Sequence, residues 1–337
     1  MTRFSRIISL LVGLIPVLIS APAFPEALSD PTSASRQANS QMDEMLFRIS
    51  MFHHEARSSL LSSLDLPFFQ DYFALPESRK LARDSNHMPL FSKMQQELRH
   101  HMESWAVRLH RRFPIAETCL VDHEGQEHLR VVGDKAEAAY LFSDHEQGAP
   151  FFEPAFRLPK GAVHLSKPYM SADSLMWVVA FVSPVVLPGG QIPGFLHFEV
   201  PLSYYQELVM TKDLPFRADR EVRPNKDEEG RYFILDENGL LLADSGQVIE
   251  LRLKEERNPR SHEDLPDYLP PEKLETYLPP LTSIQSDPVF LQAVAQGRGK
   301  LAGETVFSIG KARYILVYRM VPDRPWILFH LDPILSP

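Results

Sequence analysis

The sequence predicts an α+β protein in which one long helix is followed by two antiparallel sheet modules. Apolar residues recur at spacings of three and four over residues 41–65, which is the period of one face of a helix. Short apolar or alternating runs bounded by Gly and Pro then predict strands. The order of these elements returns in the second half of the chain with little residue identity, so the architecture is repeated. Each module is expected to contain about five strands with flanking helices.

The N-terminal residues have the pattern of a secretory signal peptide. Arg3 and Arg6 precede an apolar run from Ile7 to Ile19, and small residues follow it. The run is too short to cross a bilayer as a helix, which takes roughly 20 residues. We expect cleavage of residues 1–23 and a periplasmic or secreted protein; an uncleaved inner-membrane anchor is the alternative. Residues 24–40, rich in Pro and Ser, are expected to be a flexible lead.

Composition limits the classes of partner. The formal net charge is -9, so the protein has no electrostatic reason to bind nucleic acid. Cys119 is the only cysteine, which excludes an intramolecular disulfide and requires the fold to be held by packing.

Residues 66–202 are expected to form the first sheet module. A helix is predicted from about residue 90 to 113, where Pro114 stops it. A hairpin with Gly125 at its turn follows, and a helical or looped crossing leads to three more strands. The predicted strands are 118–122, 127–132, 162–169, 176–184 and 194–201.

Residues 203–335 are expected to form the second module. A short linking helix over residues 202–210 is followed by a hairpin of the same design, with Gly239 at its turn. A charged, Pro-rich crossing from 251 to 281 and a short helix over 290–295 precede the closing strands. The predicted strands are 231–235, 240–244, 299–308, 313–319 and 326–331.

In this order the elements resemble an extracytoplasmic double Cache (PAS-like) sensor domain, the input part of many bacterial chemoreceptors and sensor kinases. The segments that carry the resemblance are Leu64–Phe69, Phe113–Asp122, Leu165–Tyr169, Trp177–Pro184, Ile192–Leu202, Ile234–Gly239 and Pro325–Leu328. The resemblance implies that the first module is membrane-distal and holds a small-molecule pocket, and that the second is membrane-proximal. We call them the distal and the proximal module.

The resemblance also implies a role for Glu199. Amino-acid-binding members have an aspartate at this place on the closing strand, and it pairs with the ligand amine. Their arginine and aromatic cluster is not recognisable in Phe151–Arg157, so the sequence leaves an amine, an amino acid or a carboxylate open as the ligand.

The residues themselves suggest further members of a binding site. His197 and Glu199 share one face of their strand because side chains alternate along it. Tyr169, Asp173 and Trp177 lie close together in sequence and could supply an aromatic wall and one acid. Two arginines, Arg130 and Arg157, could meet an anionic group. For each of these residues a purely structural role, in the core or in a surface ion pair, is the competing interpretation.

No catalytic, cofactor or metal motif is recognisable. His53–His54 and His100–His101 are adjacent pairs whose members point in different directions on a helix, so neither predicts a metal site. The two hairpin turns lack the spaced acidic ligands of a calcium loop. We therefore expect neither a metal nor a cofactor, and a protein that is not an enzyme.

The sequence thus predicts a small-molecule sensor whose ligand sits in the distal module. Its signal is expected to pass to a separate membrane-bound receptor or kinase, and a homodimer through the N-terminal helix is possible. A singly anchored sensor, an accessory interaction subunit without ligand and an unrecognised periplasmic hydrolase are the alternatives.

Overall fold

The structure is a computed structural model that describes most of the chain from Pro31 onward. The described residues are 31–85, 88–171, 173–174, 176–211, 230–237, 239–246, 268–269, 297 and 301–334. The predicted signal peptide, the predicted helix over 290–295 and nearly all of the predicted crossing over 251–281 lie outside them. In the described part of the chain, no helix combines the length and the apolar character that a membrane span requires.

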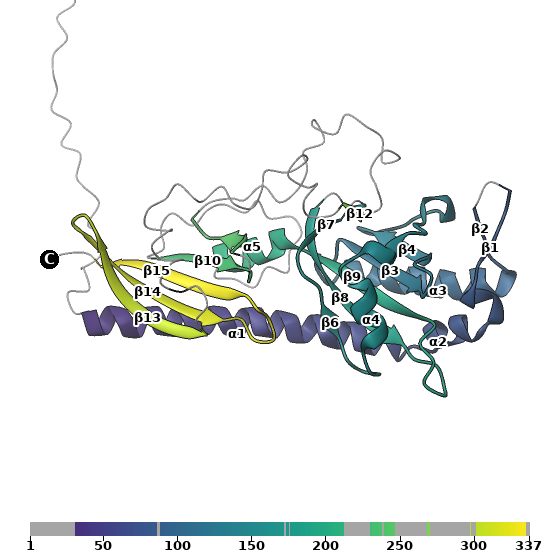
Figure 1. Cartoon of the computed structure of the whole chain (residues 1–337), viewed down its shortest axis with the longest axis horizontal. Coiled ribbons are helices and arrows are strands. Elements are labelled where there is room, and N and C mark those ends of the chain that lie inside the picture. The colour runs from purple at the N-terminus through teal and green to yellow at the C-terminus, as the bar shows by residue number, and fades with distance from the viewer. Residues whose placement is uncertain are drawn as a thin grey trace, which may run out of the picture.

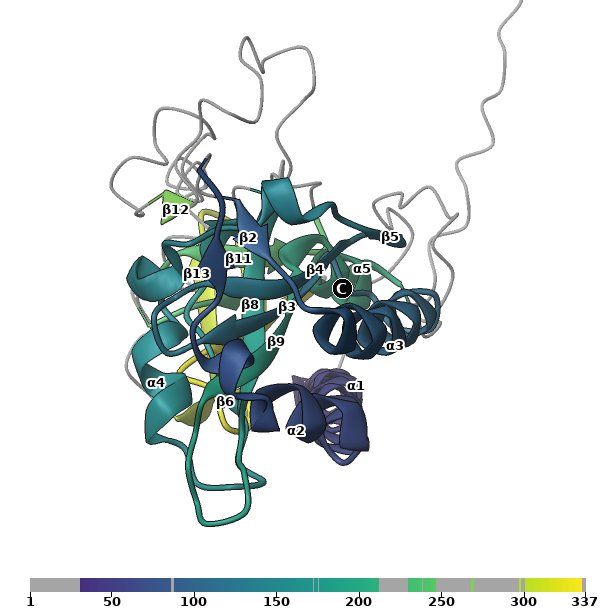
Figure 2. The ribbon, with the colours of Figure 1, turned by 90° about the vertical axis from the view of Figure 1, so that its right-hand side faces the viewer.

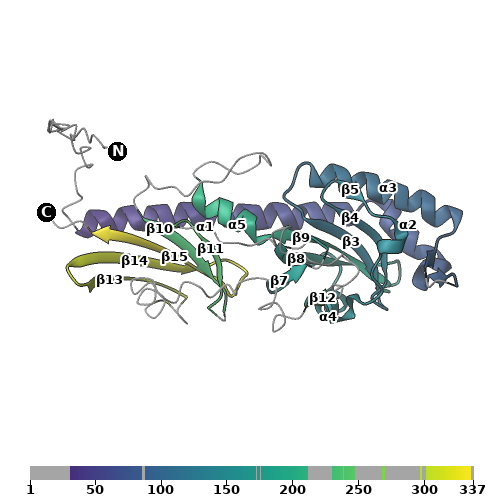
Figure 3. The ribbon, with the colours of Figure 1, turned by 90° about the horizontal axis from the view of Figure 1, so that it is seen from above.

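A single helix, α1 (Pro31–Leu64), runs along both modules (Figure 1). At 1.5 Å per residue it is about 50 Å long. One part packs against β14 (Ala312–Met320) and β15 (Ile327–Ile334) of the proximal module, and another against β8 (Met176–Val185) of the distal module. Figure 3 shows the two sheets side by side along this helix.

The start of α1 corrects the prediction of a flexible lead over residues 24–40. Residues 31–40 are helical, ten residues before the expected start at 41. Tertiary contacts explain this: Ala38 is fully buried, and its carbonyl oxygen lies 3.2 Å from Nδ1 of His330 on β15. The side chain of Asn39 donates to Glu304 and accepts a hydrogen bond from Arg319. A polar sequence is held in a helix by the sheet beside it.

The distal module begins with a helical corner that the sequence predicts only in part. The aromatic segment after Leu66 is a helix, α2 (Pro67–Ala74), and 3₁₀ helix η1 (Pro76–Arg79) follows. A small hairpin of β1 (Ala82–Arg83) and β2 (Pro89–Leu90) leads to α3 (Lys93–His110). Ser92 and Gln95 form a capping box at the start of α3, which satisfies its first backbone donors.

The distal sheet is antiparallel and larger than predicted. Its long strands are β3 (Glu117–Asp122), β4 (Glu127–Val132), β8 and β9 (Gly194–Pro201). Shorter strands are β5 (Lys135–Ala136), β6 (His164–Leu165), β7 (Tyr169–Ser171) and β12 (Tyr268–Leu269). The crossing contains η2 (Ala139–Leu141), η3 (Glu146–Gly148) and α4 (Phe152–Arg157). β12 comes from the second half of the chain and pairs with β7.

Among the described residues the proximal sheet has five antiparallel strands, as predicted. Helix α5 (Leu202–Met210) links the modules, and β10 (Arg231–Leu235), β11 (Leu241–Asp244) and β13 (Ala302–Ile309) join β14 and β15. The order is β11-β10-β15-β14-β13, and within the distal sheet the corresponding order is β4-β3-β9-β8-β7. The two modules therefore share one topology, and the predicted repeat of architecture is confirmed.

The two hairpin turns repeat at the level of single hydrogen bonds. The amide of Gly125 donates to the carbonyl of Asp122 at 3.1 Å, and that of Gly239 to the carbonyl of Asp236 at 3.0 Å. Both glycines have φ near +80°, a conformation that favours glycine. Asp122 and Asp236 also accept hydrogen bonds from backbone amides of their own turns through Oδ1. The motif Asp-x-x-Gly thus has the same structural role in both halves.

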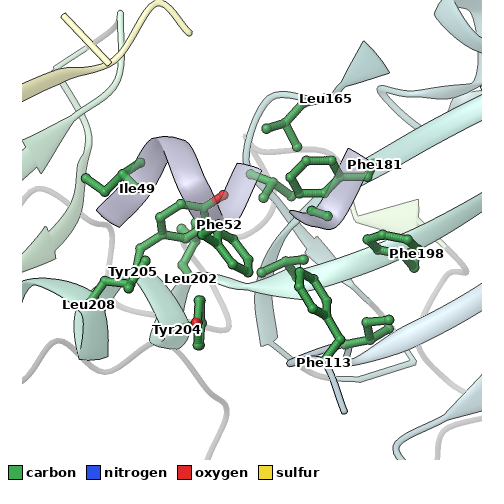
Figure 4. Packing of buried hydrophobic residues seen from close by; sticks show 14 of the residues in the cluster. Ile49, Phe52, Phe113, Leu165, Phe181, Phe198, Leu202, Tyr204, Tyr205 and Leu208 are labelled. Atoms are coloured by element: carbon green, nitrogen blue, oxygen red, sulfur yellow. The ribbon is translucent and has the colours of Figure 1, made fainter. Parts of the chain in front are cut away.

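One apolar core lies between α1 and the facing sides of both sheets. Near α5, Phe52 of α1 stacks on Phe113 at a centroid distance of 5.2 Å and lies 4.4 Å from the ring of Tyr204 (Figure 4). Tyr205 belongs to the same cluster, and its hydroxyl forms a hydrogen bond of 2.9 Å with Nε2 of His53. This core joins the helix, the linker and both modules.

Candidate functional site

The candidate site lies on the face of the distal sheet that is turned away from α1. Figure 2, an end-on view, shows α1 and α3 on one side of this sheet and α4 on the other. Because side chains alternate, Leu196, Phe198 and Val200 of β9 enter the common core, whereas His197 and Glu199 point to the α4 side. On the neighbouring strand β3, Glu117 pairs in register with Glu199, and Cys119 with His197.

Glu199 is buried against the side chains of Tyr169, Ser171 and Glu117. The hydroxyl of Tyr169 donates to its Oε1 at 2.5 Å, and the residue is only 4 % exposed. Among the described residues its Oε2 has no hydrogen-bond partner. Burial raises the pKa of the Glu199 carboxyl to about 7, because desolvation disfavours the charged form. Such a carboxylate is stabilised when a cation or a proton joins it.

Arg130 lies at the centre of the acidic groups. Its Nη2 lies 2.8 Å from Oε2 of Glu127, its Nη1 2.9 Å from Oδ1 of Asp173, and its Nε 3.5 Å from Oε1 of Glu117. Nη1 also donates to the backbone carbonyl of Leu141 at 2.5 Å. Three carboxylates and one carbonyl oxygen thus surround the guanidinium, while among the described residues its Nε and Nη2 form no hydrogen bond of regular geometry.

Three acids, Glu117, Glu127 and Asp173, lie against this arginine. Burial raises the pKa of Glu127 to about 7 and that of Glu117 and Glu146 well above the usual range, with neighbouring carboxylates adding to the effect. Glu117 accepts hydrogen bonds from the thiol of Cys119 at 2.9 Å and from the hydroxyl of Ser171 at 3.3 Å. The raised pKa values mean that part of this acidic cluster is protonated near neutral pH.

The neutral members of the site are aromatic or weakly polar. His197 is 2 % exposed, and burial, reinforced by the positive charge of Arg130, lowers its pKa to about 3. Its ring lies 4.3 Å from that of Phe151, which in turn lies 5.7 Å from Tyr169. In the described structure Nδ1 of His197 has no hydrogen-bond partner.

The structure brings five of the seven sequence-predicted residues together. Tyr169, His197 and Glu199 lie on the α4 side of the sheet, and Arg130 and Asp173 form an ion pair there. Their role in binding a ligand stays a prediction.

Two predicted residues lie elsewhere. Trp177 packs into the common core with α1. On β8, Ala180 is the residue opposite Glu199, so its side chain points to the α4 side. Trp177 is three positions before Ala180, and residues an odd number of positions apart in a strand point to opposite faces. Arg157 is exposed on α4, where it pairs with Glu153 at 2.6 Å. A surface ion pair explains this arginine.

Sequence reasoning missed the remaining acids, Glu117, Glu127 and Glu146. Alternation does not reveal Glu127, because it lies between Gln126 and His128, and a register shift between β3 and β4 at Leu120 determines its face. Only the pairing register places Glu117 opposite Glu199. Glu146 comes from the crossing, where no periodicity indicates the direction of a side chain.

A metal does not fit these groups well. Ligand atoms of Glu117, Cys119 and Glu127 lie within 4.8 Å of one another, which is a plausible spacing for a cation. Both glutamates, however, already face the guanidinium of Arg130, and burial raises the pKa of the Cys119 thiol, which keeps it protonated. An ion at this position would be repelled by the arginine.

The fold is similar to those of known sensory domains. The chain matches the sensory domain of the Campylobacter jejuni chemoreceptor Tlp3 with isoleucine bound, at 15 % identity and a TM-score of 0.54, over 90 % of this chain and 96 % of that one. The ligand-binding domain of the Pseudomonas fluorescens chemoreceptor CtaA in complex with L-serine matches at 10 % identity and 0.51, over 89 % and 97 %. No protein-family model matches the sequence, and no curated protein matches it. The predicted resemblance is confirmed at the level of the fold.

Proposed function

The chain has the double Cache fold of bacterial sensory domains, and from this premise we propose that its distal module binds a small organic solute as an extracytoplasmic sensor. The observation that carries the proposal is the buried carboxylate of Glu199, which accepts a hydrogen bond from Tyr169 and forms no ion pair with a basic side chain in the described structure. A buried acid of this kind is the natural anchor for a cationic group of a ligand.

The comparison with solved structures supports a small-molecule ligand. The Tlp3 and CtaA domains are described with isoleucine and with L-serine bound, so two domains of similar fold bind small amino acids. In this chain the face with buried polar groups belongs to the distal sheet. The ligand is proposed to lie against β3, β7 and β9, under the crossing that contains α4.

The signal is proposed to leave through α1 and α5. Helix α1 contacts both sheets, and α5 directly continues β9, the strand that carries Glu199. Arg324 of the proximal module donates to the carbonyl of Leu165 in the distal module at 2.6 Å, so the modules also touch directly. A ligand that prefers one arrangement of these contacts shifts the equilibrium toward it, by its differential affinity. A membrane-bound receptor or kinase is the proposed recipient.

A thermal-shift screen of the purified protein tests the binding function. Amino acids, polyamines, carboxylates and purines are added separately, and the melting temperature is recorded. A ligand at a hundredfold excess over its dissociation constant adds about 2.7 kcal/mol of stability, which is readily measured. We expect at least one class to stabilise the protein and Glu199→Ala to abolish the shift. A screen in which no compound raises the melting temperature would contradict the proposal and favour an accessory subunit without ligand.

A further inference from the structure

A histidine and an aspartate lie on one face of β15, in the proximal module. His330 and Asp332 are two positions apart, and residues at this spacing on a strand share a face. The face is the one toward α1, because Nδ1 of His330 lies 3.2 Å from the carbonyl oxygen of Ala38. Figure 1 shows this end of α1 running beside β15. The side chain of His330 is fully buried, and that of Asp332 is 15 % exposed.

The contact with α1 determines which nitrogen of neutral His330 carries the proton. A carbonyl oxygen only accepts hydrogen bonds, so Nδ1 must be the donor to Ala38. The other nitrogen of a neutral imidazole is then an acceptor. The ring is held in place by Tyr232 of β10, on which it stacks at a centroid distance of 4.1 Å and an interplanar angle of 4°. Nε2 of His330 is therefore fixed as an acceptor.

This nitrogen faces a second acceptor with no donor between them. Nε2 of His330 lies 3.4 Å from Oδ1 of Asp332. Both atoms are buried, and neither has a hydrogen-bond partner among the residues that the structure describes. Within the same residues, the ring of His330 is the one basic group at ion-pair distance from Asp332. Buried polar atoms are rarely left without a partner, so a positive group is expected to join these two.

The separation of the two atoms fits a shared metal ion. Zinc lies about 2.0 to 2.2 Å from its nitrogen and oxygen ligands, so a tetrahedral site places two such ligands roughly 3.3 to 3.5 Å apart. The observed distance of 3.4 Å lies within this range. A histidine that binds a metal also donates its second ring nitrogen to a carbonyl or carboxylate in most sites, as His330 does to Ala38.

Gly230 keeps side chains away from the pair. A Cβ at this position would lie 2.0 Å from Oδ1 of Asp332 and 2.4 Å from Nε2 of His330. Its φ of +101° also favours glycine. Any other residue at position 230 would place a carbon against both atoms, whereas glycine leaves them open to a third group.

We propose that His330 and Asp332 bind zinc(II) or a similar divalent metal ion between the proximal sheet and α1. Imidazole nitrogen combined with carboxylate oxygen suits such ions, whereas magnesium and calcium prefer oxygen ligands alone. The remaining coordination positions are open to water. Because the same ring bonds to α1, the bound ion restrains β15 and α1 together. The proximal module thereby gains an input that is separate from the organic solute of the distal module.

Isothermal titration calorimetry of the untagged full chain tests the inference. The probe is zinc chloride near neutral pH, set against magnesium chloride and calcium chloride. We expect zinc to bind and the other two ions not to bind. Electron paramagnetic resonance of the copper(II)-loaded protein is a second readout, and it should show coupling to one imidazole nitrogen.

Three variants locate the ion. His330→Asn keeps a donor for the carbonyl of Ala38 and removes the ligating nitrogen, and Asp332→Asn keeps the shape of the carboxylate and removes its charge. Each should weaken zinc binding at least about tenfold. His145→Asn is the matched control, because His145 forms an exposed pair with Asp144, and it should bind zinc as the parent does. Circular dichroism confirms that each variant is folded.

The contrary outcomes are equally specific. If zinc does not bind, a proton is the positive group, and the two residues form an ion pair of imidazolium and carboxylate without a metal. Unchanged binding in His330→Asn and Asp332→Asn, or equal weakening in His145→Asn, would place the ion at other histidines and overturn the inference. Copper without nitrogen coupling in the parent protein would do so even if a variant failed to fold. None of these results bears on the proposal for the distal module, which the screen with organic solutes tests separately.

Discussion

The two sheets have the same strand order, yet their faces turned away from α1 differ in chemistry. On the proximal sheet this face is mainly apolar, and its buried acid, Asp244, is neutralised by Arg231 at 2.5 Å. The apolar side chains are Phe233, Leu235, Leu241, Phe307, Leu316, Tyr318, Phe329 and Leu331. On the distal sheet the corresponding face contains Glu117, Glu127, Arg130, His197 and Glu199, all buried. The comparison teaches that the fold requires only the face toward α1 to be apolar. The opposite face is free to become either a second core or a binding site.

The largest loss of stability is expected from a substitution in the common core, which both modules share. Phe52→Ala should lower the free energy of unfolding by about 3–5 kcal/mol, because it removes a fully packed ring from the junction of α1 with Phe113 and Tyr204. Chemical denaturation, followed by circular dichroism, measures it. A loss below about 1 kcal/mol would mean that α1 does not join the modules through this core.

The second prediction concerns the acidic face alone. Arg130→Met should destabilise the protein by about 3–5 kcal/mol at pH 8, since it leaves Glu117 and Glu127 buried without their cation. The loss should shrink toward pH 5, where the carboxyls take up protons. Arg157→Met is the control: its ion pair with Glu153 is exposed, so a change within about 0.5 kcal/mol is expected. Denaturant midpoints of both variants across this pH range measure the loss of stability. Equal losses for the two variants would contradict the account.

The substitution Glu199→Gln tests the distal face through the pH dependence of protein stability. Because the folded-state pKa is raised to about 7 from an ordinary value near 4.5, the stability that Glu199 contributes is present below pH 4.5 and is lost as the pH rises through 7. The variant should lose this slope, by up to about one bound proton per molecule. His53 and His197, with pKa values lowered to about 3, contribute in the opposite sense below pH 6.5 in parent and variant alike. Melting temperatures from pH 4.5 to 8 for both proteins test this, and parallel curves would refute it.

The smallest effect is expected in the repeated turn. Gly125→Ala should cost about 1–2 kcal/mol, because φ is +82° and a Cβ would lie 2.8 Å from Cγ of Gln147. Gly189→Ala has a similar φ of +94° but no atom within 4 Å, so it isolates the backbone strain at about 1 kcal/mol. Thermal unfolding compares them. A smaller loss at Gly125 than at Gly189 would show that the crossing near Gln147 does not pack on this hairpin.

Much of the fold was predictable because local patterns determine it. The helical period, the alternating strands and the two Asp-x-x-Gly turns are all read from neighbouring residues, and the structure confirms the two antiparallel modules. The N-terminal extension of α1 was missed because it depends on contacts between Asn39 and residues more than 260 positions away. The helix over Pro67–Ala74 was missed because its aromatic residues do not show a clear period.

The site was predictable only in part, for a reason of register. Alternation along one strand placed His197 and Glu199 together, but it cannot show that Glu117 lies opposite Glu199. The same gap explains Trp177, which is close to Tyr169 in sequence and lies on the other face. Glu146 belongs to a crossing whose side-chain directions follow from tertiary packing alone.

A crystal structure of the protein grown with the solute that gives the largest thermal shift tests the central claim most directly, because it distinguishes the two sheets in one experiment. The account predicts that this solute lies on the α4 side of the distal sheet, with a polar atom about 3 Å from the carboxylate of Glu199, and that nothing is bound to the corresponding face of the proximal sheet. A solute bound at the proximal sheet, or a distal face that stays without it at saturating concentration, would contradict the account.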